Sequence, residues 1–336
     1  MNGSEKPLKL VTCGGCGSKA FIPGDLPPLG SVPCNKCGQP IMMPMRIKQF
    51  ELLHKIGTGG FGKVYRAFDT ILERLVAIKL LRREIETDPV ALENFYREAR
   101  FCASLNHTNI IHIYGFDEFE GQRLLAMELA DQGSLDAMIE KHGRVDELLV
   151  LDVGIKIASA LDMALKHNLL HCDIKPGNIL FNIENEPKLV DWGTARRVDA
   201  HVDPSAELEG TPYYVAPEKI KREPETFLSD MYSLGCTLYH AVTGHVPFEA
   251  PTVTELIQAH VEVPLTPPNQ VVLDISEGTS EALAKALAKN PGDRFLSYDE
   301  FKNALDFSRS HLIVSRNTAN NTPANLKVKT GWWRRG

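Results

Sequence analysis

Residues 171–178 read HCDIKPGN and place a histidine, an aspartate, a lysine and an asparagine within eight positions. Apolar residues flank the run on both sides, which predicts short strands near residue 170 and over 179–190. A polar loop held between two short strands is typical of a catalytic loop. The second residue, Cys172, is the one member of the run that this interpretation leaves unexplained.

The composition predicts a soluble globular protein. The 336 residues are 43% hydrophobic and 24% charged, which excludes disordered and fibrous classes. The chain contains no run of about 18 uncharged apolar residues, and no apolar stretch follows the N-terminal charges as it does in a signal peptide. We therefore expect a cytoplasmic protein. The net charge of −6 gives no strong signal for nucleic-acid binding.

Changes of pattern along the chain predict four segments. Strand-like runs dominate before residue 129, with one helix over 89–105, and helical patterns dominate after residue 133. The C-terminal stretch holds six Lys/Arg and no Asp/Glu. The predicted segments are a cysteine module over 10–41, a linker over 42–49, a two-lobed domain over 50–307 (small lobe 50–129, large lobe 130–307) and a basic flexible tail over 308–336.

Four of the seven cysteines form two C-x2-C pairs, with seventeen residues between the pairs: Cys13, Cys16, Cys34 and Cys37. Two close thiolates in each turn, followed by a glycine, can direct four sulfurs to one tetrahedral Zn²⁺. In so short a segment the metal replaces a hydrophobic core that cannot form. Iron, or a redox or disulfide role, are the alternatives. The module resembles a zinc ribbon, and the sequence does not identify the protein or nucleic acid that it binds.

A glycine-rich stretch, KIGTGGFGKVYRA, spans residues 55–67. It nearly satisfies the phosphate-binding pattern G-x4-G-K-[ST], but Val64 stands where a magnesium-binding hydroxyl is needed, and a strand follows instead of a helix. The pattern G-x-G-x-x-G-x-V is met in full, by Gly57, Gly59, Gly62 and Val64. Such a flap lets backbone N–H groups approach phosphates with no Cβ in the way. On this stretch alone, a plain glycine hairpin is an equal alternative.

Three further motifs follow in order. VAIK ends at Lys79 inside an apolar run, where a lysine needs a carboxylate partner because a buried unpaired charge is costly. DWG spans 191–193, and GTPYYVAPE spans 210–218. Together with the glycine-rich stretch and HCDIKPGN, these motifs resemble the eukaryotic-type protein kinase family over about residues 50–307. The resemblance is closest to bacterial members.

The resemblance implies an α+β fold of two lobes and an ATP-dependent serine/threonine protein kinase. A lysine two residues after the loop aspartate is similar to the serine/threonine-directed branch of the family. Asp173 would accept the proton of the attacking hydroxyl, and Lys175 would neutralise the moving phosphoryl group. Asn178 and Asp191 would bind Mg²⁺ or Mn²⁺. The tryptophan of DWG, Trp192, departs from the family's phenylalanine.

The resemblance also implies a nucleotide site between the lobes. Lys79 would hold the α- and β-phosphates and would pair with Glu98, or with Glu93 as the alternative. Met127 would border the adenine pocket, and the backbone of two residues after it would hydrogen-bond the base. The residues implied for ATP binding are Gly57, Gly59, Gly62, Val64, Ala77, Lys79, Met127, Glu128, Ala130 and Leu180.

Other residues would have architectural roles by the same resemblance. Thr211 would hydrogen-bond the catalytic loop, and Glu218 would pair with Arg294. Asp230 would brace the loop. His171 is expected to be a packed supporting residue and not a general base, despite the frequent use of histidine in catalysis.

The family pattern is altered at the positions that bear on regulation. Family members with an arginine before the loop aspartate use it to bind a phosphate on the activation segment, but Cys172 occupies that place. The usual phosphate-bearing position aligns with Glu207. We therefore predict a non-RD kinase that does not need phosphorylation of this segment, with Thr194 and Ser205 as candidate phosphorylation sites. A redox role for Cys172 is the alternative to an inert substitution.

Other functions are compatible with parts of the pattern. A catalytically inactive kinase fold could act as a scaffold, but such folds usually lose the strand lysine or an aspartate, and Lys79, Asp173 and Asp191 are all present. A small-molecule phosphotransferase would not need the segment over 210–218. A third hypothesis makes the zinc module a sensor of a partner or nucleic acid, with the kinase as its output.

Overall fold

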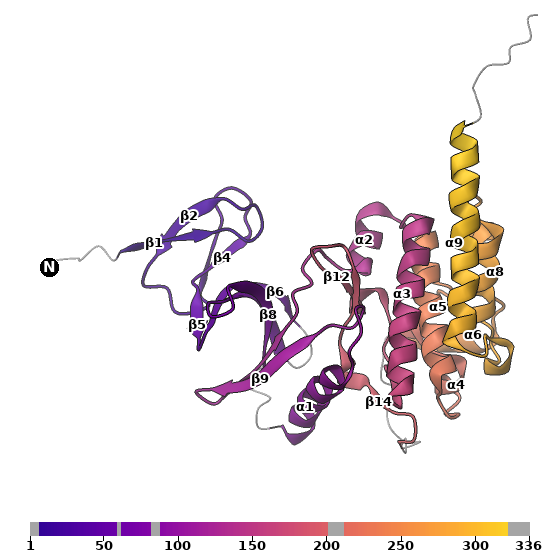
Figure 1. The fold of residues 1–336 in the computed structure, drawn as a ribbon, viewed down its shortest axis with the longest axis horizontal. Coiled ribbons are helices and arrows are strands. Elements are labelled where there is room, and N and C mark those ends of the chain that lie inside the picture. Colours follow the sequence, from indigo (N-terminus) through magenta and orange to yellow (C-terminus); the bar gives the residue numbers. More distant parts are fainter. Residues whose placement is uncertain (1–6, 59–61, 82–87, 201–211, 322–336) are drawn as a thin grey trace, which may run out of the picture.

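The computed structural model describes residues 7–58, 62–81, 88–200 and 212–321. Several residues singled out above lie outside these ranges: Gly59, Ser205, Glu207, Thr211 and residues 322–336. Along the described chain a β-rich part precedes a helical part, as Figure 1 shows. The predicted α+β fold, with a small β-rich lobe and a larger helical lobe, is therefore confirmed.

Two short antiparallel hairpins form the cysteine module. β1 (Leu8–Thr12) pairs with β2 (Lys19–Pro23), and β3 (Ser31–Pro33) pairs with β4 (Pro40–Met42). Both turns close in the same way, since the glycine after the second cysteine donates its N–H to the carbonyl of the first cysteine, at 2.9 and 2.8 Å. These glycines have φ of 68° and 75°, which glycine adopts without strain. Each turn therefore presents one C-x2-C pair.

The segment over 42–49, predicted to be a linker, contains β5 (Met45–Ile47). This strand pairs antiparallel with β6 (Phe50–Thr58) and forms one edge of the small-lobe sheet, whose order is β5-β6-β7-β8-β10-β9. The prediction of a connector is wrong here because Met42 and Ile47 bury their side chains in the small-lobe core. The module is thereby anchored to the sheet.

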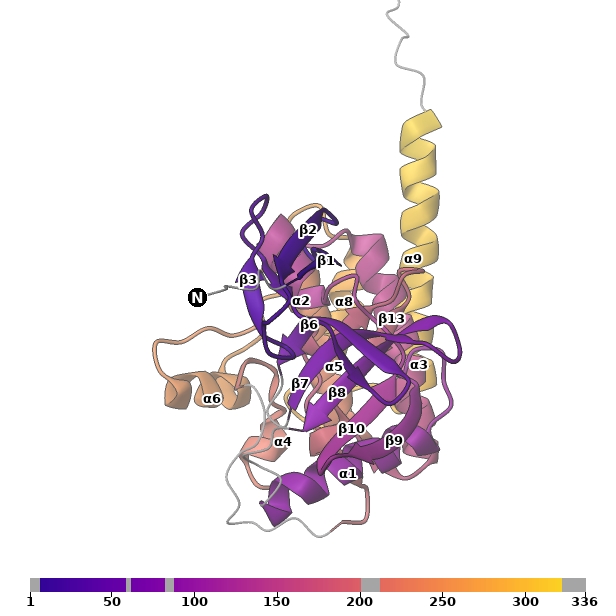
Figure 2. The same cartoon turned by 90° about the vertical axis from the view of Figure 1, so that its left-hand side faces the viewer.

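The rest of the small lobe completes the six-stranded sheet and adds one helix. Its other strands are β7 (Gly62–Asp69), β8 (Arg74–Leu81), β9 (Ile113–Phe119) and β10 (Gln122–Met127). Helix α1 (Pro89–Ser104) begins at a proline, which suits a first helical turn. It buries Phe95 and Ala99 against Leu81 and Leu125 of the sheet. Figure 2 shows α1 beside the β9–β10 end of the sheet.

The large lobe is built on two long buried helices, α3 (Glu147–Lys166) and α5 (Phe227–Thr243). Two short antiparallel sheets of two strands each, β11 (Leu169–Leu170) with β14 (Arg196–Arg197) and β12 (Ile179–Phe181) with β13 (Pro187–Leu189), carry the polar loops. The remaining helices are α2 (Leu135–His142), α4 (Pro217–Ile220), α6 (Val253–Glu262), α7 (Pro268–Val271), α8 (Glu277–Ala286) and α9 (Tyr298–Asn321). None of the helices in the described ranges is long and apolar enough to cross a bilayer.

Helix α9 continues to Asn321, so the prediction of a flexible tail from residue 308 is wrong for residues 308–321. Leu305 is fully buried, and Leu312, about two helical turns further along the same face, packs against the same core. Arg309 and Arg316 pair with carboxylates of α3 and its N-cap, at 3.1 and 2.9 Å. Two of the six basic residues that suggested a tail thus face acidic neighbours, and the other four lie outside the described residues. The helix rises beyond the other helices in Figure 1.

Candidate active site

The loop over 171–178 runs from β11 to β12, and its polar centre is Asp173. The Asp173 carboxylate lies 2.6 Å from the Lys175 ammonium and 3.1 Å from the side-chain nitrogen of Asn178. The same nitrogen donates to the Asp173 carbonyl at 2.8 Å. Asp173 therefore contacts both of the polar residues expected to act with it, and 11% of its side chain is exposed.

Asp230 of α5 supports the backbone of this loop. Its carboxylate accepts the N–H groups of His171 and Cys172 at 2.7 and 2.9 Å. Residue 172 has φ of 67°, a left-handed conformation that is unfavourable for a cysteine, and these hydrogen bonds help to hold it. Burial raises the pKa of Asp230 above its ordinary value. The brace expected from the sequence is present.

His171 is fully buried, and its contacts fit a supporting residue. Its Nε2 donates to the carbonyl of Val190 at 3.0 Å, while its Nδ1 accepts the N–H of Asp173 at 3.3 Å. These two bonds engage both ring nitrogens inside the protein. The ring also packs edge-on against Trp192, with centroids 4.7 Å apart.

Lys79 and Glu98 form a buried ion pair between β8 and α1. Lys79 Nζ lies 2.5 and 2.7 Å from the two carboxylate oxygens, and the residues are 7% and 5% exposed. Burial alone lowers the pKa of Lys79, but the carboxylates of Glu98 and Asp191 outweigh it, so the pKa is raised overall. The alternative partner, Glu93, is exposed and pairs with Arg100.

The DWG segment lies against α1. Asp191 has φ of 63°, in the left-handed region, and Trp192 is fully buried beside His171. Arg97 of α1 donates to the carbonyl of Gly193, so the helix that carries Glu98 is also tied to this segment. Thr194 donates to the carbonyl of His171 at 3.2 Å. Arg97 was not singled out by the sequence, because nothing local distinguishes it from other helix arginines.

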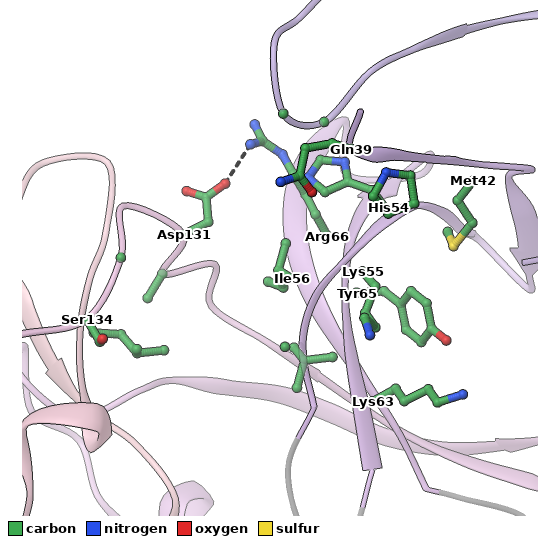
Figure 3. Close-up of a pocket in the computed structure, with 18 of the residues that line it drawn as sticks. Gln39, Met42, His54, Lys55, Ile56, Lys63, Tyr65, Arg66, Asp131 and Ser134 are labelled. Carbon is green, nitrogen blue, oxygen red and sulfur yellow. Dashed lines mark hydrogen bonds and ion pairs between the residues drawn. The ribbon is translucent and has the colours of Figure 1, made fainter. Parts of the chain in front are cut away.

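A cavity of about 820 Å³ opens between the small lobe and the start of the large lobe, and Figure 3 shows part of its lining. Four of the residues expected to bind ATP line it: Gly57, Val64, Ala130 and Leu180. The phosphate-side residues Lys79, Asp173 and Asp191 do not line this cavity. The cavity therefore borders four of the ten residues expected to bind ATP and none of these three phosphate-side residues.

The other residues expected near the adenine ring are more deeply placed. Ala77 and Met127 are buried in the core cluster against which Val64 and Leu180 pack. The N–H of Glu128 donates to the carbonyl of His112 at 2.8 Å, so that amide is already used inside the protein.

Gly62, at the far end of the glycine-rich stretch, is required by close strand packing. A Cβ at Gly62 would lie 2.3 Å from the carbonyl oxygen of Leu80 on the neighbouring strand. No side chain fits at that distance, because the obstacle is backbone. The close pairing of β7 with β8 is therefore sufficient to explain why residue 62 is a glycine, without any role in binding phosphate.

Glu218 and Arg294 form a bidentate ion pair inside the large lobe, as expected. Their N···O distances are 2.7 and 2.8 Å, and each residue is 2% exposed. Ser229 donates a further hydrogen bond to Glu218 at 2.7 Å. Burial alone raises the pKa of Glu218, but the Arg294 guanidinium and the hydrogen bonds outweigh it and lower the pKa overall.

Cys172 lies beside a cluster of three charged residues, Arg196, Lys219 and Glu225, that the sequence did not reveal. Arg196 and Lys219 both face Glu225, at 2.8 and 3.9 Å, and 10% of the Glu225 side chain is exposed. Lys219 also donates to the carbonyl of Cys172. Burial raises the pKa of the Cys172 thiol to about 12, which does not fit the low pKa of a redox cysteine. Only tertiary structure brings these residues together, so no sequence signal marked them.

The four cysteines of the module converge as expected for a metal site. Their sulfur atoms all lie within 4.8 Å of one another, with 3.6 Å between Cys13 and Cys37 and 3.8 Å between Cys16 and Cys34. Zinc–sulfur bonds of about 2.3 Å in a tetrahedron place sulfurs about 3.8 Å apart, so the geometry fits zinc. Backbone N–H groups of Lys36 and Cys37 lower the pKa of Cys34 to about 6. A backbone N–H also lowers the pKa of Cys37, but burial and the neighbouring thiols outweigh it and raise this pKa to about 12. The spacing of the sulfurs therefore carries the assignment to zinc.

The sequence model of the protein kinase domain family matches residues 50–304. Serine/threonine-protein kinase PknH of Mycobacterium bovis is 33% identical over 249 residues, covering 74% of this chain and 42% of PknH. PknE and PknD of Mycobacterium tuberculosis are also 33% identical, covering 74% and 78% of this chain and 44% and 40% of their own lengths. The chain thus spans less than half the length of these relatives, and the cysteine module precedes the family match.

Proposed function

Since this chain belongs to the protein kinase domain family, we propose that it transfers the γ-phosphoryl group of ATP to serine and threonine hydroxyls of protein substrates. The observation that carries the proposal is the buried Lys79–Glu98 pair, which lies close enough to Asp191 for that carboxylate to raise the pKa of Lys79. This pairing of strand lysine and helix glutamate is the arrangement that an active kinase requires. The serine/threonine assignment is supported by the names of the three mycobacterial relatives.

The polar loop is proposed to act on the substrate hydroxyl. Asp173 orients the hydroxyl and accepts its proton, and Lys175, 2.6 Å away, neutralises charge on the moving phosphoryl group. Lys79 holds the α- and β-phosphates of ATP. The oxygen donors of Asn178 and Asp191 fit Mg²⁺ or Mn²⁺, which when bound would neutralise phosphate charge. His171 positions the loop and takes no part in proton transfer.

A phosphoryl-transfer assay tests this function. The purified chain, given labelled ATP, Mg²⁺ and a generic protein substrate, is expected to label serine and threonine. Asp191→Ala should lower the rate by about 100-fold or more, because a main electrostatic contact with the reacting groups is lost. Asp306→Ala, which removes an exposed carboxylate of α9 paired with Arg309, is the matched control and should be unaffected. Wild-type activity no higher than that of Asp191→Ala would support the inactive scaffold instead.

We also propose that activation does not need a phosphate on the segment after Thr194. Cys172 cannot bind a phosphate through charge, and Glu225 already places a carboxylate between Arg196 and Lys219. The Glu225 carboxylate thus takes the place that a phosphate could otherwise occupy as the partner of Arg196 and Lys219.

Phosphatase treatment of the wild-type chain is expected to leave activity within about twofold of the untreated value. Glu225→Gln is expected to lower activity by about tenfold, because it leaves two partly buried cations without their carboxylate. The exposed neighbour variant Glu223→Gln is the control. An inactive dephosphorylated chain, or an inactive Ser205→Ala variant, would contradict this proposal.

The module is proposed to bind one Zn²⁺ through its four cysteines, and it also offers a surface to an unidentified protein or nucleic-acid partner. Sulfur spacing supports zinc, since the distances match a tetrahedral site and are far longer than a disulfide bond. Measuring zinc per chain tests this assignment and is part of the experiment described below.

A further inference from the structure

The cysteine module lines one side of the cavity described above. Six of its residues line this space. The three of them that lie within two residues of a cysteine, Gly14, Gly15 and Gln39, are called the module wall. The expected nucleotide residues Gly57, Val64, Ala130 and Leu180 line other parts of the same cavity. Figure 3 shows Gln39 and His54 at the edge of the cavity where Arg66 of β7 pairs with Asp131. The metal-binding segment and the nucleotide segment therefore share one cavity.

The module is held against the small lobe by packing. Strand β5 extends the small-lobe sheet, and Met42 is buried in the core of that sheet with Leu29 packed against it. The backbone of Leu29 donates to Met43 at 3.1 Å, and Met43 donates to Gly30 at 2.7 Å. These contacts attach the residues around Leu29 and Met42 to the small lobe. The cysteine turns of the module lie at the cavity.

The two cysteine turns differ in sequence at the place where the first turn contacts His54. The first turn reads C-G-G-C and the second reads C-N-K-C. A Cβ at Gly14 would lie 2.7 Å from the imidazole of His54, and a Cβ at Gly15 would lie 2.7 Å from Gln39. The equivalent positions of the second turn carry exposed side chains, Asn35 and Lys36. Gly14 therefore lies where the first turn packs against the kinase lobe, whereas Gly15 lies where the first turn packs against the module's own Gln39.

The wall consists of the metal-binding turns themselves. Gly14 and Gly15 lie between Cys13 and Cys16, and Gln39 follows Cys37 by two residues. The buried core of the module has few members, and two of them are ligands: Cys13, Ile22, Cys34, Ile41 and Met43. A module of this size depends on its metal for order, because its core alone is too small. Loss of the metal would therefore loosen the wall.

We propose that the zinc-loaded cysteine turns form one wall of the ATP site, so that zinc binding to the module tightens ATP binding by the kinase domain. This inference rests on the proposed function. The turns act as a wall and not as a plug, because the cavity of about 820 Å³ stays open beside them. A nucleotide entering between Gly57 and Ala130 would gain contacts with the wall that a loosened module could not supply.

The test is nucleotide affinity, measured separately from activity. A non-hydrolysable ATP analogue with Mg²⁺ is titrated calorimetrically into the full chain, either loaded with one zinc per chain or stripped by a chelator and dialysed. The stripped chain is expected to bind about fivefold more weakly, equivalent to about 1 kcal/mol, and to recover on addition of zinc. Cys16→Ser with Cys37→Ser should reproduce the stripped state.

Two wall variants separate the wall from the metal. Gly14→Leu should push the first turn away from His54 and weaken binding of the analogue by about fivefold while zinc content stays at one per chain. The matched control is Asn35→Leu, which adds the same side chain at the equivalent position of the exposed turn and should bind like wild type. Gln39→Ala removes a wall side chain without adding bulk, and should weaken binding about threefold if Gly14→Leu fails to fold.

Each outcome has a defined meaning. Equal affinity of the loaded and stripped chains, tighter binding by the stripped chain, or wild-type affinity in both Gly14→Leu and Gln39→Ala would overturn the inference. Phosphoryl transfer by the wild type would leave the proposed function standing in all three cases. If the loaded chain bound no analogue and transferred no phosphate, the proposed function would fail together with the inference.

Discussion

Asp173→Asn is expected to lower kcat by about 10²- to 10⁴-fold, the usual contribution of a positioned proton acceptor. The amide keeps the shape of the carboxylate but cannot accept the hydroxyl proton, and it loses the charge that faces Lys175 at 2.6 Å. Binding of the ATP analogue should change by less than about twofold, because Asp173 lies outside the nucleotide cavity. Steady-state kinetics and calorimetry measure the two quantities separately.

The control for this variant is Asp162→Asn on α3, which removes a carboxylate that is likewise paired with a lysine, Lys166, at 2.8 Å. It should leave kcat unchanged, since that pair lies on the surface of a helix away from the loop. If Asp173→Asn kept more than about a tenth of wild-type kcat, proton acceptance by Asp173 would be excluded as a main contribution to the rate.

Arg294→Met is expected to lower the free energy of unfolding by about 3–5 kcal/mol, because it leaves the buried Glu218 carboxylate without its partner. Arg294 also donates to the backbone carbonyls of Ala288 and Leu228, so these lose a donor as well. Urea unfolding of the wild type and the variant gives the difference. Arg144→Met, which breaks the exposed pair with Asp274, should cost less than about 1 kcal/mol.

The effect of Arg294→Met should depend on pH in a defined direction. The pKa of Glu218 in the folded protein is below its ordinary value of 4.5, so the pair contributes stability above about pH 4.5 and loses it as pH falls through the folded pKa. The difference between wild type and variant is therefore largest near neutral pH and shrinks in acid. A difference that stayed constant, or grew, below pH 4.5 would show that ionised Glu218 is not the cause.

Much of the site could be predicted because its residues lie in short motifs. The segments around Lys79, Asp173 and Asp191 each combine a strand pattern with polar residues at fixed spacing, so their local structure follows from local sequence. The choice of Glu98 over Glu93 as the partner of Lys79 was also available, and the buried pair confirms it. The cysteine spacing likewise predicted four sulfurs around one point.

Contacts between distant segments were not predictable in this way. Glu225 lies between Arg196 and Lys219 only because the chain folds back beside the catalytic loop, and no local pattern distinguishes it from an exposed glutamate. Residues 308–321 were interpreted as part of a tail because the C-terminal stretch is polar and basic, yet Leu312 packs against the large-lobe core, and Arg309 and Arg316 pair with carboxylates about 160 residues earlier in the chain. The periodicity of apolar residues within one segment gives no information about ion pairs between that segment and a distant one.

The sequence by itself determined the family, the two lobes, the residues proposed for catalysis and the cysteine cluster, because each depends on residue types at short fixed spacings. Only the tertiary structure decided that the linker is a strand and that the C-G-G-C turn packs against His54 at the edge of the nucleotide cavity. The physical reason is that side-chain periodicity and turn chemistry act over a few residues, whereas packing of one module on another depends on the shapes of both folded surfaces.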